Sequence, residues 1–126
     1  MAASEAKSAI KNTIVISDLS TIVKMVQEIE NDIRNEKYDV SYLRINDLIH
    51  SLIQIKQLII SMGYEEHELI KKMIVQLSIL RRQLETVMYK NDDLDVLKVN
   101  QKLSEFEIEL SELAAKIKFP LSGGKK

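Results

Sequence analysis

Residues 45–62 read INDLIHSLIQIKQLIISM, and apolar side chains recur in this stretch every three or four positions. Residues three and four apart share one face of an α-helix, so the stretch predicts a helix with one apolar stripe that must be shielded from water. Three further stretches repeat the pattern. The four stripes are Leu19, Ile22, Val26, Ile29 and Ile33; Ile45, Leu48, Leu52, Ile55, Ile59 and Met62; Ile70, Met73, Leu77, Leu80, Leu84 and Val87; and Val96, Val99, Leu103, Phe106, Leu110, Leu113 and Ile117.

The segments between the stripes are short and polar. Gly63 stands where a left-handed residue commonly ends a helix, and Asp92 or Asp93 is a suitable N-cap for the last helix. Short connections place consecutive long helices side by side and antiparallel. The sequence therefore predicts an all-α fold, an antiparallel up-down-up-down four-helix bundle. The alternative is a set of long helical hairpins that complete their core by dimerisation.

The bundle is expected to occupy residues 17–119. Residues 1–16 are expected to form an N-terminal arm or a short helix, because the run 13–16 is Thr-Ile-Val-Ile, and β-branched residues favour an extended conformation. Residues 120–126 begin with proline, which stops a helix, and are expected to form a C-terminal tail.

The composition excludes several classes of protein. The chain has 126 residues, no Cys and a net charge of −1. The absence of Cys excludes a disulfide scaffold, a thiolate zinc site and a Cys nucleophile. The balanced charge argues against nucleic acid as a partner. No apolar run approaches the roughly 18 residues of a membrane span, and no signal peptide is recognisable. We therefore expect a soluble protein, intracellular or part of a virion.

Few residues suggest catalysis or metal binding. Asp47 and His50 have the carboxylate-x-x-imidazole spacing found in di-iron bundles, but those sites need such a pair on each of two helices and two further Glu. Both residues also lie away from the apolar stripe of their helix. The chain has two His, three Gly and no Gly-rich phosphate loop. We therefore expect no enzymatic activity, no metal, no cofactor and no small-molecule substrate.

Arg44 and His50, separated by five residues, resemble the Arg-x(4–6)-His pattern of the HEPN ribonucleases, which are all-helical. The resemblance covers these two residues. In that family the position after the arginine is usually polar, whereas here it is Ile45 on the apolar stripe. The resemblance implies a helical ribonuclease as a remote alternative function.

Aliphatic residues that lie off the stripes are the most suggestive functional feature. Each stripe is complete without them, so burial in a contact between chains would explain them. The expected self-association residues are Val75, Ile79, Leu94, Leu97 and Ile108. An alternative is a docking groove for a partner helix, formed by Ile49, Ile53 and Ile60. Wide apolar faces in a four-helix interior, with scattered surface aliphatics, would also account for them.

The expected function is that of a non-enzymatic structural protein, a self-associating helical-bundle subunit. A small, Cys-free, Ile- and Lys-rich, all-helical chain resembles, in composition and expected fold, the structural proteins of viruses that infect hyperthermophilic archaea. This resemblance implies a small virion or filament structural protein. The alternative is an intracellular adaptor or chaperone-like module. The expected partner is accordingly a second copy of the chain or another helical protein.

Overall fold

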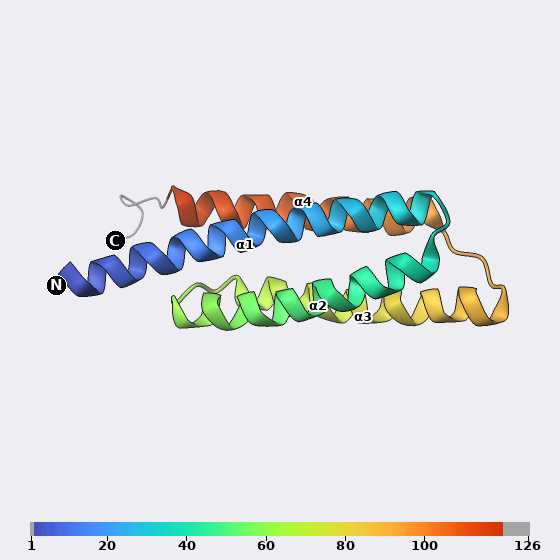
Figure 1. The fold of residues 1–126 in the computed structure, drawn as a ribbon, viewed down its shortest axis with the longest axis horizontal. Coiled ribbons are helices and arrows are strands. Elements are labelled where there is room, and N and C mark those ends of the chain that lie inside the picture. The colour runs from blue at the N-terminus through green and yellow to red at the C-terminus, as the bar shows by residue number, and fades with distance from the viewer. Residues whose placement is uncertain (1, 120–126) are drawn as a thin grey trace.

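The computed structural model describes residues 2–119, which form four long helices and no strand (Figure 1). The helices are α1 (Ala2–Arg34), α2 (Tyr38–Ser61), α3 (His67–Lys90) and α4 (Val96–Lys118). Consecutive helices run in opposite directions, which confirms the predicted four-helix bundle. The tail expected at residues 120–126 lies outside the described residues.

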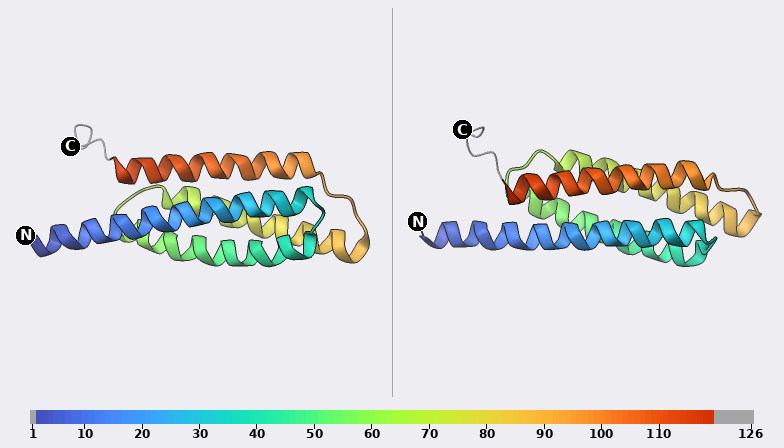
Figure 2. Two further views of the ribbon diagram at one scale, coloured as in Figure 1. Left: turned by 45° about the horizontal axis from the view of Figure 1, so that its top comes forward. Right: turned by 90° about the horizontal axis from the view of Figure 1, so that it is seen from above.

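The helices form two layers. Figures 1 and 2 show α1 beside α4 in one layer and α2 beside α3 in the other. Helix α1 packs closely against both α4 and α2, and α2 packs closely against α3. Helices α3 and α4 are not a closely packed pair, although they are consecutive in the chain. The bundle therefore has three tight seams and one loose seam.

The predicted stripes form one continuous core between the layers. Their residues are buried, with the exceptions of Met62, Val87, Val96 and Val99, which are partly exposed. Val15 and Ile49 are also buried in this core. Each fully buried aliphatic side chain contributes roughly 1.5–3 kcal/mol relative to an exposed one, so the stripes supply the main driving force for folding.

Of the two alternatives expected for residues 1–16, an arm or a short helix, the extended arm is wrong: residues 2–16 are helical and form the first half of α1. Val15 is fully buried, so an extended arm would lose this packing. A β-branched residue lowers helix stability by less than about 0.7 kcal/mol, which packing readily outweighs. The hydroxyl of Thr13 donates a hydrogen bond to the carbonyl of Ala9 at 3.0 Å and is thus satisfied within the helix. Tertiary packing, together with helix continuity, overrides the local β preference.

Among the residues of α1 whose burial the structure describes, Val15 is also the first in the core. Helix α1 continues past the ends of α2 and α3 (Figure 1), and its residues 2–14 are here called the N-terminal extension. Ile10 is 59% exposed and Ile14 is 44% exposed. The extension therefore presents apolar side chains that the described part of this chain does not cover.

Gly63 ends α2 as predicted. Its φ is +82°, and the amide of Tyr64 donates to the carbonyl of Ile59 at 3.2 Å. This is the Schellman arrangement, in which a left-handed residue allows the last carbonyls of a helix to be satisfied.

Helix α1 ends in the same way, but without glycine. Glu36 has φ +57°, and the amide of Lys37 donates to the carbonyl of Asp32 at 2.8 Å. A left-handed conformation costs a residue with a Cβ atom roughly 1–2 kcal/mol. The turn between α1 and α2 therefore carries local strain at Glu36.

The predicted cap of α4 is wrong by two or three positions. Asp95, and not Asp92 or Asp93, accepts a hydrogen bond from the amide of Lys98 at 3.1 Å. The chain is non-helical from Asn91 to Asp95, where it leaves α3 with a left-handed Asn91. This longer connection lets α4 pack on α1 while standing away from α3.

Candidate functional site

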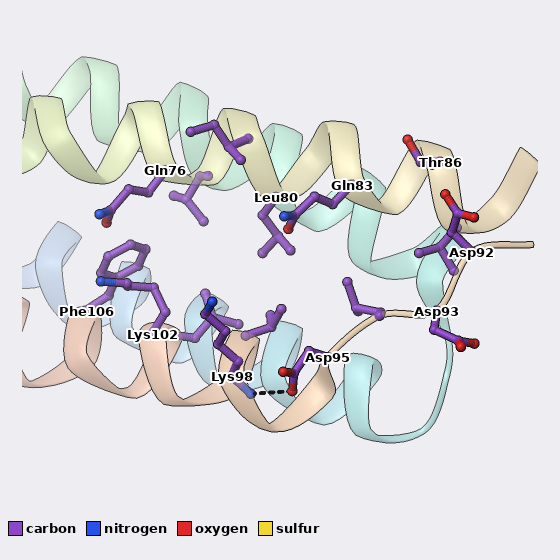
Figure 3. A pocket seen from close by; sticks show the side chains of 16 residues that line it. Gln76, Leu80, Gln83, Thr86, Asp92, Asp93, Asp95, Lys98, Lys102 and Phe106 are labelled. Carbon is purple, nitrogen blue, oxygen red and sulfur yellow. Dashed lines mark hydrogen bonds between the residues drawn. The ribbon is translucent and has the colours of Figure 1, made fainter. Parts of the chain in front are cut away.

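The loose seam between α3 and α4 contains a cleft of about 540 Å³, here called the α3–α4 groove (Figure 3). It exists because the residues on these two helices face each other without close backbone packing. Its lining is contributed by α3, α4 and the connection between them. The lining residues are Gln76, Leu77, Ile79, Leu80, Gln83, Thr86, Val87, Asp92, Asp93, Leu94, Asp95, Lys98, Val99, Lys102, Leu103 and Phe106.

The floor of the groove is apolar. Leu80 and Phe106 point into it from opposite walls (Figure 3) and are 7% and 3% exposed. Toward the α3–α4 connection the floor is formed by Val87, Leu94 and Val99, which are partly exposed. Val87 and Val99 belong to the core stripes. They remain partly exposed because no neighbouring helix covers them here.

The walls of the groove differ in charge. The α3 wall carries the uncharged Gln76, Gln83 and Thr86, whereas the α4 wall carries Lys98 and Lys102. The mouth, at the α3–α4 connection, carries the carboxylates of Asp92, Asp93 and Asp95. A ligand in the groove therefore meets negative charge at the mouth, positive charge on one wall and neutral polar groups on the other.

The length of the groove matches that of a short helix. Its walls run over residues 76–87 of α3 and 95–106 of α4, which at 1.5 Å per residue is about 17 Å, or three helical turns. An apolar floor of this length, flanked by polar walls, is typical of sites that bind an amphipathic helix through residues at i, i+3 or i+4, and i+7.

Apart from the α3–α4 groove, a cluster of polar side chains lies on the seam between α1 and α4. The hydroxyl of Ser104 donates to the Oε2 atom of Glu30 at 2.7 Å, and the side-chain amide of Gln27 donates to Glu107 at 3.2 Å. Glu30 is 6% exposed. Burial, followed by a hydrogen bond shared with the neighbouring Glu107 carboxylate, raises the pKa of Glu30 to about 7. Two carboxylates thus share this seam most stably when one is protonated.

A shallow depression adjoins this cluster. Leu97 and Ile108 lie among its lining residues, together with Glu30, Arg34 and Ser104. The two aliphatic side chains are 71% and 59% exposed. This surface is mixed, with two separated apolar groups around a polar centre, and it lacks the continuous apolar floor of the α3–α4 groove.

The structure divides the predicted self-association residues among different surfaces. Ile79 and Leu94 line the α3–α4 groove, and Leu97 and Ile108 line the depression on the α1–α4 seam. Val75 is 54% exposed on α3 and lines neither.

The alternative docking residues on α2 are also separated. Ile49 is only 7% exposed and belongs to the core, whereas Ile53 and Ile60 are 42% and 45% exposed.

Sequence reasoning did not identify the polar walls of the α3–α4 groove. Gln76 and Gln83 stand seven residues apart beside the α3 stripe, and Lys98 and Lys102 stand four apart beside the α4 stripe. The sequence signal for the α3 wall was the pair of uncharged residues Gln76 and Gln83 along one edge of the α3 stripe, because the solvated edge of a helix more often carries charged residues.

The residues considered for catalysis or metal binding do not converge. Asp47 and His50 are both exposed on α2, as their wheel positions predicted. Within residues 2–119, no group of three or more His, Cys, Asp or Glu side chains could hold a metal ion.

Arg44, the arginine of the HEPN-like pair, connects two helices. Its guanidinium lies 2.6 Å from a carboxylate oxygen of Glu28 and 2.9 Å from one of Asp32, both on α1. His50 lies on the same helix as Arg44, about 120° around its axis. Arg44 therefore joins α2 to α1, and the two side chains of the pair diverge.

None of the four described helices is both long and apolar enough to span a bilayer. The chain was also compared with known proteins. No protein-family model, no curated protein and no solved structure matches it.

Proposed function

We propose that this protein is a non-enzymatic interaction subunit that binds one amphipathic helix in the α3–α4 groove. The observation that carries the proposal is the loose seam: three of the four seams are closed by helix packing, and the fourth leaves a cleft whose apolar residues Val87, Leu94 and Val99, near the α3–α4 connection, are partly exposed. A helix in the groove would cover Val87, Leu94 and Val99 and remove their apolar surface from water.

In this proposal, the polar walls of the groove determine which helices bind. Gln76 and Gln83 can donate and accept hydrogen bonds on one side, and Lys98 and Lys102 attract acidic side chains on the other. The carboxylates at the mouth disfavour an acidic segment there. Such flanking groups reject poorly matched helices more than they add affinity.

Two forms of this function follow from the source of the helix. If the helix belongs to another copy of the chain, the protein is a self-associating structural subunit, and the virion or filament protein expected from the sequence is one such assembly. If it belongs to a different protein, the chain is an adaptor. Both forms use the same groove, and neither requires a cofactor.

The proposal is tested with selected peptides. A display library of helical peptides of about three turns is selected against the whole protein, and the best binder is titrated by fluorescence anisotropy. Ile79 lines the groove and is 51% exposed, so Ile79→Glu introduces a charge there without disturbing the core. Ile53→Glu is the matched control, because Ile53 is 42% exposed on α2 and lies outside the groove.

Ile79→Glu is expected to weaken binding at least about tenfold, which corresponds to about 1.4 kcal/mol, while Ile53→Glu leaves it unchanged. Equal affinity for the two variants, or a library that yields no binder, would overturn the proposed function.

A further inference from the structure

We infer that the helix held in the α3–α4 groove is the N-terminal extension of a second copy, so that chains assemble head to tail. The inference rests on the proposed function of the groove and names its occupant. It joins two features that face opposite ways along the molecule: an uncovered helical extension at one end and a helix-sized groove whose mouth lies at the other.

The placement of the two surfaces supports this pairing. The extension points away from the bundle at the end where α4 finishes, whereas the mouth of the groove is at the α3–α4 connection, at the opposite end (Figures 1 and 2). Both lie along the long axis of the molecule. An identical copy placed end to end would therefore bring its extension to the end of the groove that the α3–α4 connection lines.

The lengths also correspond. Residues 2–14 span about 20 Å as a helix, and the groove spans about 17 Å. In a head-to-tail pair the extension runs parallel to α3 of the receiving copy, with Ile14 near the mouth and Ile10 one turn deeper. These two isoleucines, four residues apart on one side of the helix, would then cover Leu94, Val87 and Val99.

The charges of the extension fit one wall of the groove. The extension contains Lys7, Lys11 and one acidic residue, Glu5, so residues 6–14 carry positive charge only. We place the isoleucines on the floor of the groove and the extension parallel to α3. In this orientation both lysines lie on the side of the extension that faces the α3 wall. The groove-lining side chains of that wall are uncharged, and Asp92 follows at its end. Lys98 and Lys102 lie on the opposite wall. Lys11, the lysine nearer the mouth, is therefore placed toward Asp92 and away from the basic wall.

This contact uses two different surfaces of each chain. A two-fold dimer would place the same surface on both sides of the contact, whereas a head-to-tail contact leaves one extension and one groove unused at the ends of every open oligomer. Assembly then continues to a filament, or to a ring if the geometry closes.

The test exploits this asymmetry. Ile10→Glu disables the extension and leaves the groove intact, and Ile79→Glu disables the groove and leaves the extension intact. Both residues are more than half exposed, at 59% and 51%, so each variant is expected to keep the circular dichroism of the wild type. Ile53→Glu is again the control on an uninvolved face. Sedimentation velocity follows the assembly of each protein, and of a mixture, over a concentration series that reaches the high micromolar range.

The wild type and Ile53→Glu are expected to form concentration-dependent oligomers, and each of the other variants alone is expected to be a monomer. A 1:1 mixture of Ile10→Glu and Ile79→Glu is expected to give a dimer and nothing larger, because only one extension and one groove remain functional. If either variant is misfolded by circular dichroism, the exposed charges replace it: Lys11→Glu should weaken assembly, and Lys11→Glu with Asp92→Lys in one chain should restore it.

A monomeric wild type, normal assembly of Ile10→Glu, or a mixture that stays monomeric would overturn the head-to-tail contact. Each of these results would leave the peptide titration unaffected. The proposed occupant can therefore fail while the proposed function of the groove stands, and the two failures are distinguishable.

Discussion

Replacing Glu30 by Gln should stabilise the protein at alkaline pH and leave its stability unchanged in acid. Glu30 is 6% exposed between α1 and α4, where it accepts a hydrogen bond from Ser104 and faces Glu107. Its pKa is raised from 4.5 to about 7, first by burial and then by the hydrogen bond with Glu107. The native state therefore holds a proton that the unfolded state releases near pH 4.5.

The sign and size of the effect follow from this difference in proton binding. Below about pH 4.5 the carboxyl is protonated in both states, and its favourable native contacts are fully present. Between about pH 4.5 and 7 the unfolded state loses the proton first, so the free energy of unfolding falls as the pH rises. At 1.36 kcal/mol per pKa unit, the loss reaches about 3 kcal/mol above pH 7. Glutamine keeps the size of the side chain, can donate to Glu107 and accept from Ser104, and carries no charge at any pH.

The assay is urea unfolding monitored by circular dichroism at several pH values from 4 to 8.5. The difference in unfolding free energy between Glu30→Gln and the wild type isolates the Glu30–Glu107 pair, because the titrating groups outside this pair affect both proteins equally. It should be near zero at pH 4 and favour the variant by about 3 kcal/mol at pH 8.5. Glu105→Gln, at an exposed position of α4, is the control and should show a nearly flat difference. A flat curve for Glu30→Gln, or destabilisation at pH 8.5, would refute the reasoning.

Three further changes test the fold and its surfaces. Glu36→Gly should raise the free energy of unfolding by about 0.5–1 kcal/mol in urea melts, because glycine removes the left-handed strain at φ +57° but adds some unfolded-state entropy; a destabilised variant would contradict this. Leu52→Ala should cost about 2–5 kcal/mol and His50→Ala less than about 0.5 kcal/mol, since the first is buried and the second exposed; similar losses in the same melts would show that α2 faces the wrong way. Leu97→Glu with Ile108→Glu should leave helicity unchanged by circular dichroism, because both side chains are exposed; an unfolded double variant would place them in the core.

Much of the fold was predictable from the sequence because the spacing of apolar residues determines which face of a helix is buried. Leu52 and Leu80, which belong to the predicted stripes, lie in the core, and Gly63 ends its helix as expected. The prediction was wrong where a local preference competed with packing that the sequence pattern did not reveal. Residues 13–16 have the side chains of a strand, but the burial of Val15 extends the core, and with it α1, toward the N-terminus.

The α3–α4 groove was not predictable from spacing alone. Periodicity defines the direction in which a side chain points, but not the distance to the next helix. Val87 and Val99 belong to their stripes as fully as Leu84 and Leu103 do, yet only the second pair is fully covered. The distance depends on the path of the connection, and the cap at Asp95 made that path longer than the sequence suggested.

The polar cluster on the α1–α4 seam was equally hidden. Glu30 and Glu107 are far apart in the chain, and each reads as an ordinary charged residue on an amphipathic helix. Their meeting requires the register between α1 and α4, which depends on side-chain interlocking along the whole seam. The raised pKa of Glu30 is thus a property of the packed pair of helices rather than of any local motif.

The arrangement of the seams also determines which helices can most easily move relative to one another. Among the helices that the structure describes, α1 with α2 is the only closely packed pair that joins the two layers. A small roll of one layer against the other about this pair changes the spacing of α3 and α4 while the three tight seams stay packed. We therefore expect the width of the groove to change more easily than the spacing of the closely packed helices, and a helix bound as proposed would be accommodated by shear of the layers rather than by rebuilding of the core. A bound helix would stiffen this motion, and amides of α3 and α4 beside the groove would then exchange their hydrogens more slowly.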